Sequence, residues 1–124
     1  MKSAQDYLAE ANAIVPKIET QAGIAKHGQS GVVFVDVRDS AAIQESGTIA
    51  GALRIPRGFI EFAADQATQF HNPQMDKDAE IILVCGAGGQ AALAGRTLVE
   101  MGFKYVSNVG GFGSWKDEGG PFEA

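Results

Sequence analysis

The sequence predicts an α/β domain with a central, mainly parallel sheet flanked by helices. Two short apolar runs, at 32–37 and 81–84, are typical of strands that are buried on both faces of a parallel sheet. Helical patterns precede, separate and follow these runs, and this alternation is characteristic of parallel α/β folds. Ligands of such folds bind beyond the carboxyl ends of the strands, which is where the second run leads into Cys85.

The first 29 residues are expected to form a helical extension that packs on the domain. Ser3 can cap a first helix, which ends before Pro16. One apolar stripe of this helix contains Tyr7, Leu8, Ala11, Ile14 and Val15. A short strand is expected at Ile18, and Thr20 can cap a second, short helix.

The middle of the chain alternates short strands and short helices. Strand 32–37 is followed by a helix that Ser40 can cap and that ends near Gly47. A brief strand is expected over 52–55. The segment 57–72 predicts a helix followed by a loop. Its apolar positions are Phe59, Ile60, Phe62, Ala63 and Phe70.

The C-terminal third supplies the second buried strand and the longest helix. Residues 90–101 predict a helix that ends at Gly102, a favoured residue after a helix. The last strand is expected over 104–109, and a short helix that carries Trp115 follows it. The glycine-rich segment 119–121 is expected to end the fold.

Length, charge and cysteine content restrict the class of protein. The chain has 124 residues, 45% of them hydrophobic, which suffices for one domain with its own core. A formal net charge of −5 argues against nucleic acid or an acidic membrane surface as a partner. No apolar run approaches the roughly 18 residues of a membrane span, and the N-terminus lacks the apolar stretch of a signal peptide. With a single cysteine, no internal disulfide can form, and we expect a cytoplasmic protein without a metal.

Cys85 lies between the second buried strand and the longest helix, and three glycines follow it within four residues. The thiolate is the reactive form of cysteine, but a free cysteine is mostly protonated at neutral pH. No Lys or Arg lies between Cys85 and Gln90, so backbone N–H groups and the helix dipole have to stabilise the anion. Glycines allow successive N–H groups to turn toward one point. The stretch therefore predicts a thiolate site.

Two other interpretations of this stretch remain open from the residues alone. A free cysteine is often a small, inert, buried hydrophobe. A glycine-rich turn before a helix can also bind phosphate. The stretch completes neither G-x-G-x-x-G nor the Lys-Ser/Thr ending of a P-loop, which makes phosphate binding the weaker of the two.

Three separated segments, in this order, resemble the rhodanese (sulfurtransferase) family. The first is VDVRD at 35–39 with GTIAGALRIP at 47–56, which is similar to the family's DVR … GHIPGAxxIP region. The second is Cys85 with its six-residue loop ending at Gln90. The third is GGFGSW at 110–115 with the following Gly-Pro, similar to GGFxxW … GxP. A Pro-Arg-Gly sequence around Arg57 also resembles a subgroup of single-domain members.

The resemblance implies one rhodanese-like domain over 1–124, with the catalytic nucleophile at Cys85. This cysteine would accept a sulfane sulfur from a donor such as thiosulfate, become a persulfide and pass the sulfur to a thiophilic acceptor. Arg57 is expected near the pocket, where it would bind an anionic donor. The loop residues that would hold the sulfur anion are Gly86, Ala87, Gly88, Gly89 and Gln90.

The implied chemistry needs no cofactor, because the covalent persulfide carries the group. The expected partners are a small-molecule sulfur donor and acceptor, with a sulfur-accepting protein as a further candidate. The sequence does not indicate an oligomeric state. Asp36 and Arg38 are expected to hold the fold together rather than to take part in the reaction.

This chain departs from the family pattern at two positions. Many members have Arg where Gln90 stands, and an amide offers an anionic donor no charge. Thr48 stands where the first region often has His. The alternative function is a non-catalytic rhodanese-like module that carries sulfur or binds a protein. A phosphatase or arsenate reductase of related fold would need a longer loop that ends in Arg, which this chain lacks.

Overall fold

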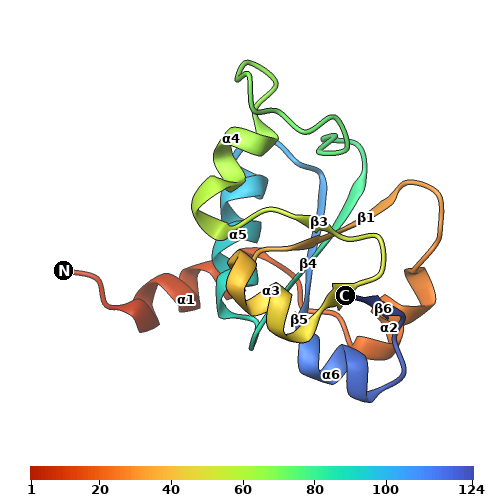
Figure 1. Ribbon diagram of the computed structural model, residues 1–124. Coiled ribbons are helices and arrows are strands. Elements are labelled where there is room, and N and C mark those ends of the chain that lie inside the picture. Colours follow the sequence, from red (N-terminus) through yellow and green to blue (C-terminus); the bar gives the residue numbers. More distant parts are fainter.

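A four-stranded parallel sheet forms the centre of the computed structural model, which describes residues 1–124 (Figure 1). Along the sheet the strands follow the order β3-β1-β4-β5, and every neighbouring pair is parallel. The four strands are β1 (Val32–Asp36), β3 (Leu53–Arg54), β4 (Glu80–Cys85) and β5 (Tyr105–Gly111). The predicted α/β class and parallel sheet are confirmed.

Alternating residues of the central strands divide the core into two clusters. Val35, Ile81 and Leu83 face the cluster that is covered by the helices α4 (Ile60–Ala64) and α5 (Gly89–Glu100). Their neighbours Phe34, Ile82 and Val84 face the opposite cluster, to which α6 (Phe112–Asp117) contributes Phe112 and Trp115. Both faces of the sheet are therefore buried, as the continuous apolar runs predicted. None of the helices is long and apolar enough to span a membrane.

The N-terminal helix α1 (Ala4–Ile14) packs against α5, while its first turns project away from the rest of the molecule (Figure 1). Ser3 caps it as predicted, in a reciprocal capping box with Asp6. Ala11 is buried, and so is Val15 just after the helix. Tyr7 and Ile14 belong to the predicted apolar stripe but are exposed. The domain covers only a narrow part of the surface of α1.

Two predicted helix caps differ in the structure. The helix α3 (Ser40–Ser46) is capped by Asp39, whose Oδ1 accepts the N–H of Ala42 at 3.1 Å. Ser40 is its first helical residue instead. The helix α2 (Thr20–Lys26) likewise starts at Thr20, and no side chain caps it. A capping residue adopts an extended backbone, and in both cases the residue one position earlier does so.

A second, two-stranded sheet was not predicted. The strand β2 (Thr48–Ile49) pairs antiparallel with β6 (Phe122–Glu123), so the fold continues past the segment 119–121. A strand of two residues is too short to show a periodic pattern, because an alternation is recognisable only over several residues. The strand expected at Ile18 is reduced to a single parallel bridge between Lys17 and Asn108, at the outer edge of β5.

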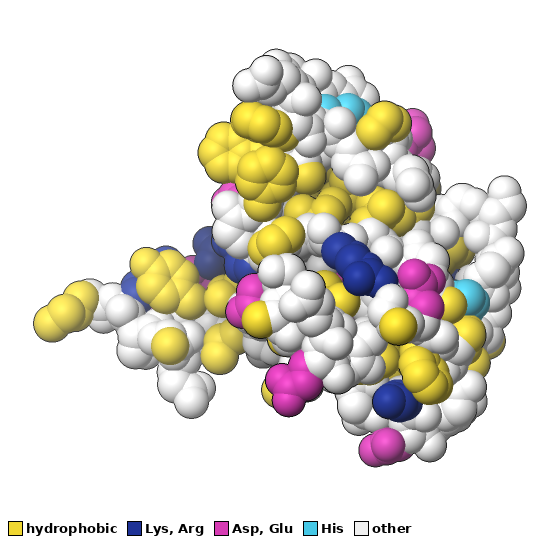
Figure 2. Space-filling model, viewed as in Figure 1, with side chains coloured by type: hydrophobic (Ala, Val, Ile, Leu, Met, Phe, Trp, Pro, Cys, Tyr) yellow, Lys and Arg dark blue, Asp and Glu magenta, His cyan; other side chains and the backbone are white.

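The segment between β3 and β4 contains a 3-10 turn, η1 (Arg57–Phe59), then α4 and a long loop. Ile60 and Ala63 are buried in the core. Three aromatic side chains of this segment pack on one another at the surface, with ring centroids 5.4 to 6.5 Å apart: Phe59, Phe62 and Phe70. Figure 2 shows hydrophobic side chains gathered over α4.

Candidate active site

Cys85 is the last residue of β4, at the carboxyl edge of the sheet. Its side chain belongs to the core cluster under α5 and is 1% exposed. Residues 86–88 connect it to the start of α5. No group of three or more His, Cys, Asp or Glu side chains is arranged so that it could hold a metal ion.

Two backbone N–H groups donate hydrogen bonds to the Cys85 sulfur. The N atom of Gly88 lies 3.0 Å from Sγ, and that of Ala91 lies 3.3 Å away. Ala91 is in the first turn of α5, so the positive end of the helix dipole also faces the sulfur. Both interactions place positive partial charge next to the sulfur. Ala91 lies one residue beyond the predicted loop. The first N–H groups of any helix lack acceptors within the helix, and this rule could have indicated that the N–H of Ala91 is available to the sulfur.

Four further N–H groups of the loop have no acceptor within the protein. They belong to Gly86, Ala87, Gly89 and Gln90. Gly88 adopts φ +97°, a left-handed conformation that other residues rarely adopt, and this reverses the chain between strand and helix. The loop therefore retains hydrogen-bond donors for an anion beyond those that the thiol already uses.

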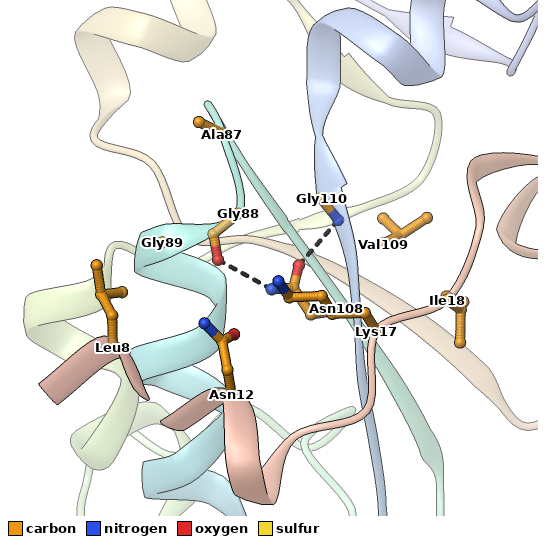
Figure 3. Close-up of a pocket in the computed structure, with 10 residues that line it drawn as sticks. All are labelled: Leu8, Asn12, Lys17, Ile18, Ala87, Gly88, Gly89, Asn108, Val109 and Gly110. Carbon is orange, nitrogen blue, oxygen red and sulfur yellow. Dashed lines mark hydrogen bonds between the residues drawn. The ribbon is translucent and has the colours of Figure 1, made fainter. Parts of the chain in front are cut away.

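Asn108 on β5 holds the loop from the side, as Figure 3 shows. Its Nδ2 donates to the carbonyl oxygen of Gly88 at 2.9 Å, and its Oδ1 accepts the N–H of Gly110 at 2.8 Å. The side chain is buried. The sequence analysis missed this residue, although a polar side chain in a buried strand, two residues before a pair of glycines, is a usable signal.

β5 also approaches the loop through its backbone. A Cβ built at Gly111 would lie 2.5 Å from the carbonyl oxygen of Gly86. No other amino acid fits there without displacing the turn that follows Cys85. Gly111, in the GGFGSW segment at 110–115, therefore allows β5 and the loop to pack this closely.

The side chains of the other two predicted site residues make no hydrogen bond to the sulfur. The side chain of Gln90 is exposed on the first turn of α5 and makes no hydrogen bond within the protein. Arg57 donates to Thr97 at 3.2 Å and to Glu61 at 3.3 Å. Thr97 lies about two helical turns, or roughly 12 Å, beyond the start of α5. The guanidinium of Arg57 therefore bonds to the C-terminal half of α5, and its expected part in donor binding stays a prediction.

A buried ion pair lies at the carboxyl end of β1. Asp36, fully buried, accepts hydrogen bonds from Arg38 at 2.7 Å and from the hydroxyl of Thr48 at 2.7 Å. Other N–H groups of Arg38 donate to Ser46 Oγ and to the carbonyl oxygen of Gly47. This network joins β1 to α3 and β2, in agreement with the structural role expected for Asp36 and Arg38.

The profile of the rhodanese-like domain family matches residues 20–118. The chain belongs to the rhodanese-like domain family. The matched residues contain all four strands of the sheet, the Cys85 loop and every helix except α1.

Two solved structures resemble this rhodanese-like chain over most of its length. A protein of unknown function from Rhodopseudomonas palustris, described as a possible tyrosine phosphatase, is 37% identical with a TM-score of 0.93. The similarity covers 99% of this chain and 96% of that one. The polysulfide-sulfur transferase homodimer of Wolinella succinogenes is 25% identical with a TM-score of 0.75, and the similarity covers 94% of this chain and 83% of that one.

A curated protein of Bacillus subtilis, "Putative sulfur carrier protein YrkF", is 26% identical over 110 residues. The similarity covers 88% of this chain and 55% of that protein, so the chain spans about half the length of this relative. The family and these relatives support sulfur transfer in general.

Proposed function

We propose that this chain is a sulfurtransferase that carries sulfane sulfur as a persulfide on Cys85. The observation that supports this most directly is that Sγ accepts hydrogen bonds from two backbone N–H groups, at 3.0 and 3.3 Å. The loop around it has further N–H groups without acceptors. Such a site favours a sulfur anion without any cationic side chain.

In the first half-reaction the Cys85 thiolate attacks the outer sulfur of the donor. With thiosulfate, the S–S bond of the donor breaks, a new S–S bond forms at Sγ, and sulfite leaves with the electron pair. The persulfide then carries the negative charge on its terminal sulfur. The free N–H groups of the loop, such as those of Gly86 and Ala87, can donate to this atom.

In the second half-reaction a nucleophilic acceptor attacks the terminal sulfur. The S–S bond of the persulfide breaks, and the Cys85 thiolate leaves with the electron pair, ready for the next donor. This is a double-displacement scheme in which the covalent intermediate divides the transfer into two steps. A small thiol, cyanide or an accepting protein thiol can serve as the acceptor.

The burial of Cys85 adds a conformational step to this scheme. Because the residue is 1% exposed, the turn 86–88 has to move outward before a donor can approach Sγ. Gly86 and Ala87 are exposed, so the outward movement mainly breaks the hydrogen bonds that Gly88 makes with Sγ and with Asn108. Gly88 also lets the backbone rotate more freely than other residues would.

The proposal extends to the organisation and location of the chain. Residues 1–124 form one rhodanese-like domain, with 1–29 as a helical extension packed on it, and the contact of α1 with α5 supports this. A cytoplasmic location agrees with a lone, reduced cysteine.

The second candidate function is that of a non-catalytic sulfur carrier or protein-interaction module. The name of the YrkF protein favours it, as does the absence of a positively charged side chain in the loop. A carrier would accept sulfur on Cys85 but release it to small acceptors slowly or not at all.

Intact-mass spectrometry distinguishes these functions. The protein is incubated with thiosulfate and, separately, with inorganic polysulfide, and then treated with cyanide. We expect Cys85 to gain one sulfur atom, which cyanide removes as thiocyanate over repeated cycles, while Cys85→Ser gains none. Loading without release to cyanide would favour the carrier. If neither donor loads a correctly folded wild-type protein, the persulfide proposal is wrong.

A phosphatase assay provides a further control, because of the description attached to the Rhodopseudomonas palustris protein. In this chain no Arg lies in the loop to bind a tetrahedral oxyanion. We expect no hydrolysis of p-nitrophenyl phosphate above the rate of Cys85→Ser.

A further inference from the structure

A cleft of about 300 Å³ lies beside the Cys85 loop, on the side of β5 (Figure 3). One wall comes from the loop and from β5, through residues 87–89 and 108–110. The other wall comes from the N-terminal extension, through Leu8, Asn12, Lys17 and Ile18. All four of these residues precede residue 20, where the match to the family begins. One wall of the cleft therefore lies outside the part of the chain that matches the family.

We infer that this cleft binds the body of a small, carboxylate-bearing thiol persulfide, with Lys17 as the cation for its carboxylate. The inference rests on the proposed sulfur transfer and names the class of donor. In the reaction, Cys85–S⁻ attacks the outer sulfur of R–S–S⁻, a new S–S bond forms at Sγ, the S–S bond of the donor breaks, and R–S⁻ leaves with the electron pair. The product R–S⁻ is the small thiol itself.

The charge of the cleft supports an anionic ligand. Lys17 is exposed and is the only charged residue that lines it. Seven of the ten Lys and Arg residues form an ion pair with a carboxylate, but Lys17 forms none. An unpaired cation in a cleft without carboxylates attracts anions locally, even in a chain with a net charge of −5.

The lining of the cleft supports an organic ligand over a bare inorganic anion. Leu8, Ile18 and Val109 supply apolar surface, and the side-chain amide of Asn12 can donate or accept hydrogen bonds. Figure 3 shows Leu8 and Asn12 extending from α1 toward the loop. A volume of about 300 Å³ is at the lower end of the range for small-molecule sites, roughly 300–1,000 Å³.

Gly88 connects the cleft to the reacting sulfur. It lines the cleft, its N–H donates to Cys85 Sγ at 3.0 Å, and its carbonyl oxygen is held by Asn108. A molecule in the cleft therefore lies against the residue that has to move when the loop opens. Cys85 itself does not line the cleft, so the sulfur-bearing end of a bound donor would reach Sγ past Gly88 once the loop has moved.

A binding experiment tests the cleft independently of sulfur transfer. The probe is N-acetyl-S-methylcysteine, which has a carboxylate and cannot transfer sulfur; its methyl ester lacks the charge. We expect the acid to shift the amide NMR signals of 87–89 and 108–110 saturably, and the ester to bind more weakly. Lys17→Ala should weaken binding of the acid by about two- to fivefold, whereas the control Lys77→Ala, which removes another exposed, unpaired lysine, should not.

Kinetics of persulfide formation separate this inference from the proposed function. Lys17→Ala should raise KM for N-acetylcysteine persulfide and leave KM for inorganic polysulfide unchanged. Equal binding of acid and ester, or an unchanged KM for both donors, would overturn the inference while sulfur transfer stands. If the acid binds at Lys17 but no donor ever loads Cys85, the proposed function fails and the binding site remains.

Discussion

The side-chain amide of Asn108 donates a hydrogen bond to the carbonyl oxygen of Gly88, at 2.9 Å, and thereby joins the edge strand β5 to the loop that holds the Cys85 sulfur. The N–H of the same Gly88 donates to Sγ. One peptide segment is thus held from the side by Asn108 while it donates to the candidate nucleophile. Asn108 is a positioning residue in this arrangement, because it acts on the sulfur through Gly88.

Replacing Asn108 by Ala is expected to lower the free energy of unfolding and to loosen the loop that follows Cys85. The change leaves the carbonyl oxygen of Gly88 and the N–H of Gly110 without their partner. Both hydrogen bonds are partly buried, so each loss should cost about 1 kcal/mol, the low end of the range for buried groups. Urea unfolding measures this loss.

The rate of persulfide formation, followed by mass spectrometry on protein that is still folded, should fall as well. Asn108→Asp keeps the acceptor for Gly110 and loses the donor to Gly88. It also places a carboxylate oxygen against the carbonyl oxygen of Gly88, so we expect it to restore none of the rate. A normal rate in Asn108→Ala would show that Gly88 does not need this support.

Gln90→Arg is expected to raise the turnover with thiosulfate more than the turnover with an uncharged sulfane donor. The side chain at this position is exposed on the first turn of α5 and has no partner within the protein, so an arginine can be accommodated without repacking. A guanidinium would add a charge and two-pronged hydrogen bonding to an anionic donor. Steady-state kinetics with both donors measure the effect, and equal changes would mean that loop charge is not limiting.

Asp36→Asn is expected to lower the free energy of unfolding by about 3–5 kcal/mol, because it leaves the buried guanidinium of Arg38 without its counter-charge. Urea denaturation of the variant and the wild type measures this difference. The exposed ion pair between Lys104 and Asp78 is the matched control. Asp78→Asn should leave the unfolding midpoint nearly unchanged, and a similar loss in both variants would contradict a special role for the buried pair.

The contact of α1 with α5 should depend on pH through Glu10. Hydrogen bonds from Lys2, and then from Arg96, lower the pKa of the Glu10 carboxyl below its ordinary value. A carboxyl with a lowered pKa in the folded state contributes stability that is fully present above its unfolded pKa, about 4.3, and is lost as the pH falls through the folded pKa.

The measurement for Glu10 is the urea midpoint between neutral pH and pH 3. We expect Glu10→Gln to lose stability mainly at neutral pH and to approach the wild type at the acidic end. The effect should be small and should shrink in high salt, because the group is at the surface. A constant difference at every pH would mean that charge is not its cause.

The limits of prediction follow from the length of each pattern. The runs that became β1 and β4, and the amphipathic pattern of α5, repeat over enough residues to determine element type, and all three were predicted. β2 and β6 have two residues each, and they form only because the C-terminal segment returns to lie beside Thr48 and Ile49. The exposure of Tyr7 and Ile14 likewise depends on how little of α1 the domain covers.

By itself, the sequence determined the parallel α/β class, the family resemblance and Cys85 as the candidate nucleophile. These depend on local patterns and on residue order along the chain. Only the tertiary structure brought Ala91 to the sulfur, Asn108 to Gly88, and Lys17 to the cleft beside the loop. It also directed Arg57 toward Thr97. Such contacts join residues from different elements, and their geometry follows from packing, which no local pattern encodes.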